Sequence, residues 1–416
     1  MKASHHEKIT QHQLANGLQI VYERSESPVV YCGYVVKAGT CNEESADTGM
    51  AHFLEHISFK GTSHRKAFQI NRYIDAVGGD LNAYTTKQDT VYTISILKDH
   101  FARAVELLTD IVFFSTYPQR EIDREVEVIC DEIESYQDTP AELIFDDFER
   151  LLFNGHAMGR DILGTPERLR EYTTADAMRF AEKFYCPDNC VFFVLGNIDF
   201  PLLVKRLERL TQPVLRRCSG KTGEIGKVSD EMALFREHHL KKGTHQSHVV
   251  AGSYLQDEHT VKRSAAMLLS NLLGGPAMSS RFNQLLREKA GLVYSVDSYL
   301  TRYRDILVWS VYFGCDTHDV PRCLQIIRRE IRRMAAAPLS DVQLRAAKRQ
   351  LIGQMALSLE QREGYAVSLG RSMAHYGKIR DIDEEMQAIN ALTATDVQHA
   401  AQSFFDESRL LTLIYD

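Results

Sequence analysis

The stretch Gly49-Met50-Ala51-His52-Phe53-Leu54-Glu55-His56 carries two histidines and a glutamate at helical spacing. On a helix, residues four apart lie on the same face, so His52 and His56 can each direct a ring nitrogen toward one metal ion. Glu55 then lies beside the ion, where a base for an attacking water is needed. A surface helix with solvated histidines has the same pattern, so a third ligand on another element is needed to tell the two apart.

A second amphipathic helix, expected over residues 121–133, supplies candidates for that ligand. Its apolar side chains recur at helical spacing and predict one buried stripe, made of Ile122, Val126, Ile129 and Ile133. Glu125 and Glu132 lie seven residues apart on a neighbouring face. Without the histidines, an acidic helix with solvated glutamates is the simpler interpretation. With them, a zinc site of two histidines and one glutamate, with its fourth position open for water, accounts better for both stretches.

These motifs resemble those of the inverted-zincin (inverzincin) peptidases of the insulinase, pitrilysin and mitochondrial processing peptidase family. The family signature is His-x-x-Glu-His followed by a glutamate ligand about 75 residues later, and here His56 and Glu132 are 132 − 56 = 76 positions apart. The resemblance implies one zinc ion per chain, held by His52, His56 and Glu132. It also implies that Glu55 is the general base and that Glu125 is an additional acidic residue of the active site.

Composition places the chain among ordinary globular proteins. It has 416 residues, of which 44% are hydrophobic and 25% are charged, and its length predicts two domains or more. The net charge of −7 and the isoelectric point near 6.2 show no basic excess. Nucleic acids and anionic membranes attract basic proteins, so binding to either is not expected.

The N-terminal residues 1–8 lack the apolar core of a secretory signal, and no later run has the apolar length of a membrane span. A cytoplasmic location is therefore expected. The eight cysteines show no Cys-x-x-Cys spacing, and Cys32, Cys130 and Cys315 lie in apolar strand or helix patterns. Reduced, mostly buried thiols are expected rather than disulfides or a thiolate zinc site.

Two strands are expected over residues 80–86 and 90–95. The small side chains of Asn82 and Ala83 leave the backbone of the first strand approachable, so an extended peptide can pair with it as an added strand. The substrate-binding edge strand of the family matches this segment, and the resemblance therefore assigns peptide binding to Asn82, Ala83 and Tyr84. An ordinary inner strand, with Tyr84 in a structural role, is the alternative.

The chain repeats itself at a constant offset of 394 − 174 = 220 residues, since residues 174–185 align with residues 394–405. Three pairs of identical residues coincide: Asp176/Asp396, Ala181/Ala401 and Phe184/Phe404. Two copies of one α+β unit are the simplest explanation. We therefore expect two tandem homologous domains, residues 1–215 and 231–416, joined by a polar, glycine-rich linker over residues 216–230. Each domain is expected to have a mostly antiparallel sheet with helices packed on one face.

The second copy lacks the metal motif, and a different segment of it resembles the C-terminal signature of the family. In that signature an arginine and a tyrosine seven residues later reach the active site of the first domain, and Arg287 and Tyr294 match the spacing, since 294 − 287 = 7. An arginine can hold a substrate carbonyl or carboxylate, and a tyrosine hydroxyl can donate to an oxyanion. Without the resemblance, both residues would be interpreted as structural.

The expected function is that of a zinc-dependent endopeptidase that cleaves extended peptides or unfolded segments. Glu55 would take a proton from the zinc-bound water and return it to the leaving amine, while Tyr294 and Arg287 help to stabilise the oxyanion. His156 is expected to be structural, because catalytic zinc sites usually have three protein ligands. Half-length members of the family often form dimers, so the resemblance also implies a homodimer.

Two alternatives accompany this expectation. A noncatalytic scaffold or partner subunit has the same fold without the metal site, and the complete set of candidate ligands argues against it. An enzyme that needs a separate partner chain is the second alternative, and the presence of Arg287 and Tyr294 on the same chain argues for self-sufficiency.

Overall fold

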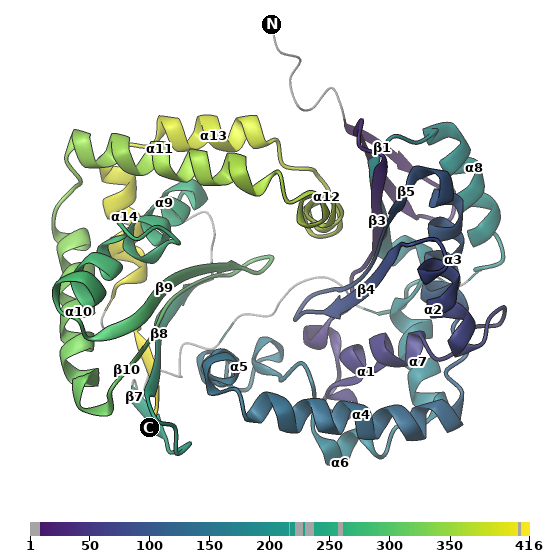
Figure 1. Ribbon diagram of the computed structural model, residues 1–416, viewed down its shortest axis with the longest axis horizontal. Coiled ribbons are helices and arrows are strands. Elements are labelled where there is room, and N and C mark those ends of the chain that lie inside the picture. The colour runs from purple at the N-terminus through teal and green to yellow at the C-terminus, as the bar shows by residue number, and fades with distance from the viewer. Residues whose placement is uncertain (1–8, 216, 221–227, 229–236, 257–260, 407–408) are drawn as a thin grey trace, which may run out of the picture. The chain divides into compact units, whose positions relative to one another are not determined.

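A computed structural model of the chain describes residues 9–215, 217–220, 228, 237–256, 261–406 and 409–416. The chain divides into two compact units, and each unit is built from stretches that are not contiguous in sequence (Figure 1). Unit 1 contains Met1–Glu134, Arg160–Gly223 and Ser358–Ile382, and unit 2 contains Ser135–Gly159, Glu224–Leu357 and Asp383–Asp416. Both units combine helices with a β-sheet, which confirms the α+β class expected from the sequence.

Unit 1 contains a six-stranded sheet with the order β1-β2-β6-β3-β5-β4. Its strands are β1 (Ile9–Gln13), β2 (Gln19–Arg24), β3 (Val29–Val36), β4 (Asp80–Thr85), β5 (Thr90–Leu97) and β6 (Cys190–Gly196). β2 and β6 are parallel, and the other neighbours are antiparallel. β4 lies at one edge of the sheet, because β5 is its pairing partner in the described part of the chain.

Both faces of this sheet are buried. Side chains alternate between the two faces along each strand. On β3, the side chain of Tyr34 packs into a layer of helices, whereas that of Val35 packs against one helix on the opposite face. The helices of the layer include α1 (Met50–Ser58), α2 (Ala67–Asp75), α3 (Phe101–Phe114), α4 (Gln119–Gln137), α7 (Thr174–Phe184) and α8 (Phe200–Thr211). The opposite face is covered by α12 (Arg362–Tyr376), which comes from the second half of the sequence.

Unit 2 contains a five-stranded sheet with the order β7-β11-β8-β10-β9. Its strands are β7 (Glu237–Leu240), β8 (Ser247–Leu255), β9 (Val293–Arg302), β10 (Leu307–Cys315) and β11 (Leu411–Tyr415). One face packs against α9 (Arg263–Gly274), α10 (Val320–Ala336), α11 (Asp341–Ser358), α13 (Ile382–Ala391) and α14 (Ala394–Phe404). On the other face lies α5 (Pro140–Leu152), whose Phe148 ring lies close to Gly252 of β8.

The two sheets share one topology, which confirms the duplication predicted from the 220-residue offset. In unit 1, β2 runs parallel to β6, which is followed by β3, β5 and β4. In unit 2, β7 runs parallel to β11, which is followed by β8, β10 and β9. The repeated helices α7 and α14 also begin alike, since Thr173 and Thr393 accept hydrogen bonds from the backbone N–H groups of Asp176 and Asp396.

The compact units follow a different course along the chain from the contiguous domains expected at residues 1–215 and 231–416. α5 belongs to unit 2 although it lies in the first half of the sequence, and α12 belongs to unit 1 although it lies in the second half. Each sheet thus has its second apolar face covered by a helix from the other half. The expected boundaries stay a prediction, and the expected linker over residues 216–230 lies mostly outside the described residues.

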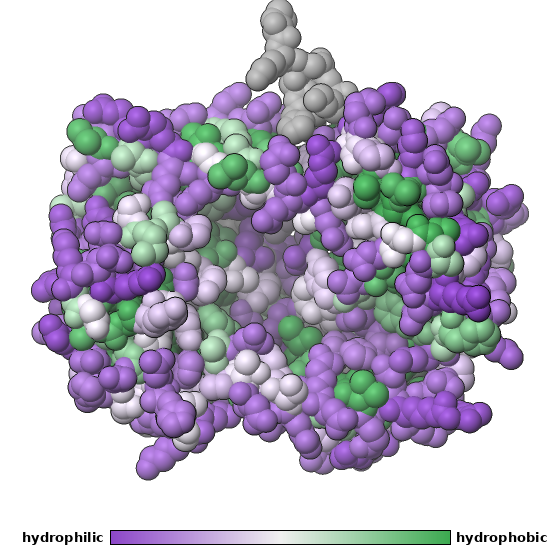
Figure 2. All heavy atoms as spheres, viewed as in Figure 1, coloured by the Kyte–Doolittle hydropathy of each residue, from purple (hydrophilic) through white to green (hydrophobic). Residues whose placement is uncertain are grey.

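Hydrophilic residues cover most of the face seen in Figure 2, and hydrophobic residues appear there in small separate groups. All eight cysteines are free thiols and six of them are buried, as the sequence predicted. Within the described residues, no helix combines the length and the apolar character that crossing a membrane requires.

Candidate metal centre

Helix α1 begins at a glycine-dependent turn. Gly49 has a φ of +84°, a conformation that favours glycine, and a Cβ at this position would lie 2.7 Å from the Cα of Gly164. The carboxylate of Glu43 accepts hydrogen bonds from the backbone N–H groups of Gly49 (3.0 Å) and Ala51 (2.9 Å). Its oxygens satisfy donors at the helix N-terminus, and burial raises the pKa of Glu43 to about 8.

The apolar residues of α1 anchor it in the core of unit 1 and leave its two histidines on a shared face. The fully buried apolar side chains are Met50, Ala51, Phe53, Leu54 and Ile57. His52 is buried and His56 is partly buried. Their ring centroids lie 4.6 Å apart, with the ring planes at 63° to each other. The spacing of four residues therefore has the consequence expected of a helix.

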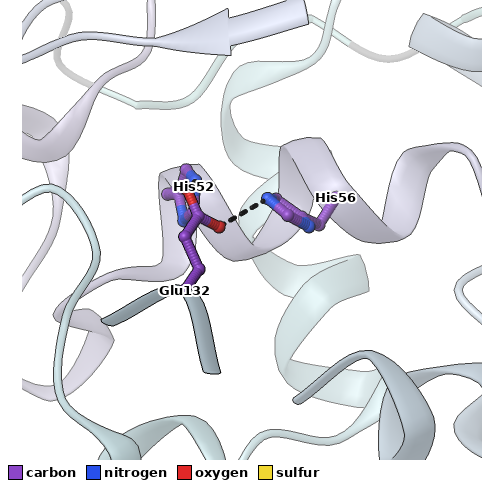
Figure 3. A group of neighbouring side chains, drawn as sticks. All are labelled: His52, His56 and Glu132. Atoms are coloured by element: carbon purple, nitrogen blue, oxygen red, sulfur yellow. Dashed lines mark ion pairs between the residues drawn. The ribbon is translucent and has the colours of Figure 1, made fainter. Parts of the chain in front are cut away.

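Glu132 of α4 reaches this pair of rings, as Figure 3 shows. Its Oε1 lies 3.9 Å from Nε2 of His52, and its Oε2 lies 3.4 Å from Nε2 of His56. The candidate ligand atoms of the three residues all lie within 4.8 Å of one another. The apolar stripe of α4, which includes the buried Ile129 and Ile133, turns the helix so that Glu132 faces α1. We call these three residues the metal cluster.

The metal cluster fits a zinc ion. Two imidazoles and one carboxylate are a known catalytic zinc set, and bonds of about 2.0–2.1 Å in tetrahedral geometry place donor atoms roughly 3.3 Å apart. The separations of 3.4 Å and 3.9 Å are close to that value. Nδ1 of His52 is buried and has no hydrogen-bond partner within the described residues, so a ring nitrogen of the cluster has its hydrogen-bonding capacity unused. Burial, followed by the charge of His56, lowers the pKa of His52 to about 4, which keeps its imidazole neutral near pH 7.

Glu125 lies outside the metal cluster and contacts the ring nitrogen of His56 that does not face Glu132. Its Oε1 lies 3.1 Å from Nδ1 of His56, and its Oε2 lies 2.6 Å from Nζ of Lys60. Because an ionised carboxylate can only accept, Nδ1 of His56 carries a proton and donates it in a hydrogen bond to Glu125, and Nε2 is directed toward Glu132. Burial would raise the pKa of Glu125, but the hydrogen bonds with His56 and Lys60 hold it below its ordinary value. Glu125 is therefore an ionised partner that orients the ring of His56.

Glu55 lies beside the cluster, on the same helix. It is 8% exposed, and its Oε2 accepts a hydrogen bond of 2.7 Å from Oγ1 of Thr85 on β4. Burial raises the pKa of Glu55, and the Thr85 hydrogen bond opposes that change. The carboxylate of Glu132, which accepts from His56, has its pKa lowered instead. Two glutamates at one site thus differ in basicity, as a base and a metal ligand should.

The segment expected to bind peptide is the edge strand β4. The side chains of Asn82 and Tyr84 are exposed, whereas Ala83 and Thr85 alternate with them on the face toward α1. Oδ1 of Asn82 accepts a hydrogen bond from the backbone N–H of Ala83 at 2.9 Å. The alternative of an inner strand is wrong for the described residues, since β4 is the last strand of its sheet.

Arg287 and Tyr294 both lie in unit 2. Arg287 is in a π-helical segment, Asn283–Lys289, and Tyr294 is near the start of β9. The guanidinium carbon of Arg287 lies 5.9 Å from the centre of the Tyr294 ring, and Tyr294 is 81% exposed. The two residues are therefore neighbours, and their action at the metal cluster stays a prediction.

Sequence reasoning missed Glu43, Lys60 and Thr85. Strand alternation carried a signal for Thr85, because it shares a face with Ala83. Glu43 and Lys60 lie in the loops on either side of α1, and no local pattern predicts their partners. His156 accepts a hydrogen bond at Nδ1 from the backbone N–H of Met158 at 3.2 Å, which suits the structural role expected of it.

Two protein-family models together match most of the chain. Residues 19–166 match the model described as insulinase (peptidase family M16), and residues 171–351 match the model of the peptidase M16 inactive domain. An uncharacterized zinc protease of Bacillus subtilis is 30% identical, with 98% of each chain covered. One from Rickettsia bellii is 31% identical, with 97% of this chain and 96% of the relative covered. One from Mycobacterium leprae is 32% identical, with 98% and 91% covered.

Solved structures show the same fold. A protease from Helicobacter pylori superposes with a TM-score of 0.87 at 20% identity, with 98% of this chain and 99% of that chain covered. A peptidase M16 inactive domain from Pseudomonas fluorescens superposes with a TM-score of 0.87 at 18% identity, with 98% of each chain covered.

Proposed function

Because the chain belongs to peptidase family M16, the insulinase family, we propose that it is a zinc-dependent endopeptidase that cleaves extended peptides or unfolded segments. The half-length, two-domain form of the family suits the 416 residues and the duplicated α+β plan. The observation that carries the proposal is the metal cluster of His52, His56 and Glu132, with Glu55 on the same helix as the two histidines.

One zinc ion per chain would be held by His52, His56 and Glu132. When bound, zinc supplies a Lewis acid that polarises a carbonyl oxygen and lowers the pKa of its water from 15.7 to about 7. Glu125 contributes by accepting a hydrogen bond from Nδ1–H of His56, which fixes the tautomer and the ring orientation. Lys60 in turn keeps Glu125 ionised and in place.

Glu55 is the proposed general base. Thr85 holds its Oε2, so Oε1 is the oxygen that can take a proton from the attacking water and return it to the leaving amine. Burial raises the pKa of Glu55 and so strengthens it as a base, while the Thr85 hydrogen bond keeps the carboxylate in one orientation. Proton transfer by a positioned group of this kind contributes typically 10²–10⁴-fold to the rate.

The proposed substrate lies along β4 as an added strand. Main-chain hydrogen bonds to an edge strand give affinity without demanding one side-chain sequence. The exposed side chains of Asn82 and Tyr84 would contact the peptide, and Thr85 at the end of the same strand connects it to the base. Arg287 and Tyr294 are proposed to stabilise the oxyanion from the second domain. A homodimer is proposed by analogy with half-length relatives, and gel filtration with light scattering tests it.

Metal analysis and peptide cleavage together test the function. We expect the purified protein to bind one zinc ion per chain and to cleave quenched fluorescent peptides in a chelator-sensitive manner. Glu55→Gln should retain zinc and lose nearly all turnover, whereas Glu132→Gln should lose zinc. Glu127→Gln is the matched control, because Glu127 is an exposed residue of the same helix that pairs with Arg170.

Stoichiometric zinc without metal-dependent cleavage of any peptide in a mixed pool would refute the peptidase proposal. It would favour the alternative of a noncatalytic scaffold. Activity that appears only after mixing with a second homologous chain would instead support an enzyme that needs a partner subunit.

A further inference from the structure

Helix α12 is closely packed on the sheet of unit 1, on the face opposite α1 (Figure 1). Its Gly370 allows this approach, because a Cβ there would lie 2.5 Å from the ring of Phe193 and 2.9 Å from Val35. Buried apolar side chains of α12, including Ala366 and Leu369, complete the contact. A segment from the second half of the sequence is therefore part of the core of the unit that carries the metal cluster.

A buried ionic network joins α12 to the turn between β4 and β5. The carboxylate of Asp89 is completely buried, and its Oδ2 lies 2.8 Å from Nε of Arg371 and 2.5 Å from Nε2 of His375. Its Oδ1 accepts a hydrogen bond of 2.8 Å from Oγ1 of Thr86. Burial would raise the pKa of Asp89, but His375 and Arg371 hold it below its ordinary value, so the carboxylate is ionised. A buried charge with these partners fixes the turn relative to α12.

The same turn follows Thr85, the residue that holds the proposed base Glu55. Thr85 directly precedes Thr86 and donates to Glu55. Within the turn, the backbone N–H of Thr86 donates to the carbonyl oxygen of Asp89 at 2.8 Å. The turn also accepts a backbone hydrogen bond at the carbonyl of Lys87 from the N–H of Cys41, in the loop that leads to α1. A shift of the turn would therefore displace both the Thr85 hydroxyl and the loop that leads to α1.

We propose that Arg371 is a positioning residue of the active site: it holds the β4–β5 turn through Asp89 and thereby places the Thr85 hydroxyl against Glu55. The inference rests on the proposed peptidase function. It explains why the catalytic unit includes a helix from the second half of the chain, and it predicts that loosening this helix impairs catalysis without removing zinc.

The test compares Arg371→Met with Arg362→Met in the full-length, zinc-loaded protein. Both arginines lie on α12 and both substitutions remove one positive charge. Arg362 donates instead to Oγ of Ser25 at 2.7 Å, beyond the end of β2 and away from the turn. Each substitution is also combined with Thr85→Val, which removes the hydroxyl that holds Glu55. Arg371→Lys keeps the charge beside Asp89 and serves if Arg371→Met does not fold.

We expect Arg371→Met to bind one zinc ion and to lower kcat about tenfold, since misplacement of a catalytic group by about 1 Å can cost up to 10²-fold. Arg371→Lys should regain part of that loss, and Arg362→Met should keep wild-type kcat. If Arg371 acts through Thr85, adding Arg371→Met to Thr85→Val should lower kcat by less than the product of the two single effects. Amide exchange in residues 85–89 should rise in Arg371→Met and not in Arg362→Met.

An unchanged kcat in Arg371→Met and Arg371→Lys, or single effects that multiply in the double variant, would overturn the inference. A merely structural role would lower the melting temperature of both α12 variants while leaving kcat per zinc-loaded molecule unchanged. Failure of the proposed function has a different signature, because the wild-type protein would then show no metal-dependent cleavage.

Discussion

Removing the carboxylate of Glu125 should weaken zinc binding without touching a zinc ligand. Glu125→Ala deletes the acceptor that lies 3.1 Å from Nδ1 of His56 and leaves Nζ of Lys60, now 2.6 Å from that carboxylate, without its partner. Loss of a second-sphere partner typically costs 10–100-fold in metal affinity, or about 1.4–2.7 kcal/mol. We expect the upper part of that range, because the free ammonium of Lys60 adds repulsion toward a cation.

A zinc titration in competition with a chelating dye, at one pH and ionic strength, measures the change. Glu125→Gln should lose less affinity than Glu125→Ala, because its amide oxygen can still accept from His56. Glu127→Ala is the control for charge, since Glu127 is exposed and lies two residues further along the same helix. Wild-type affinity in Glu125→Ala, or an equal loss in Glu127→Ala, would refute the assignment of Glu125 as the residue that orients His56.

Three further predictions concern the metal cluster, the packing of α12 and the caps of two helices. Burial lowers the pKa of His56, but its hydrogen bonds with Glu125 and Glu132 raise it to about 9. Below this pH, zinc must displace the second proton of the His56 ring, the one on Nε2. The apparent zinc affinity should therefore rise by up to about tenfold per pH unit toward pH 9 and then level off, as the same dye titration would show. Gly370→Ala should destabilise the protein by about 1–3 kcal/mol through overpacking, measured by urea unfolding. Gly364→Ala on the same helix, where a Cβ meets nothing within 4 Å, should stabilise it by about 0.5–1 kcal/mol. Thr173→Ala and Thr393→Ala remove equivalent helix caps, and each should cost about 1 kcal/mol in the same unfolding assay.

Short-range patterns predicted the elements of this chain well, because helical and strand periodicity are local properties of the backbone. The strands expected over residues 80–86 and 90–95 correspond to β4 and β5, and the histidine motif lies on a helix. Glycine at position 49 and the capping threonines reinforce these boundaries, since each acts within a few residues of its own position.

The choice between Glu125 and Glu132 depended on more than periodicity. Both share a face of α4, and spacing alone left either one able to reach the histidines. The resemblance to the inverzincins selected Glu132, and the structure brings Glu132 to Nε2 of both histidines while Glu125 contacts Nδ1 of His56. The two roles differ by two turns of one helix, a difference set by how α4 packs against α1.

By itself, the sequence determined the α+β class, the duplication, and the pairing of His52 with His56, because these follow from spacing along one chain segment. Only the tertiary structure decided which distant groups complete the site. Thr85 contacts Glu55 because β4 lies beside α1. Arg371 contacts Asp89 because α12 covers a sheet that belongs to the first half of the chain. An apolar helix face signals that it will be buried, but many surfaces can bury it, and the sheet that does so is selected by packing across the whole fold.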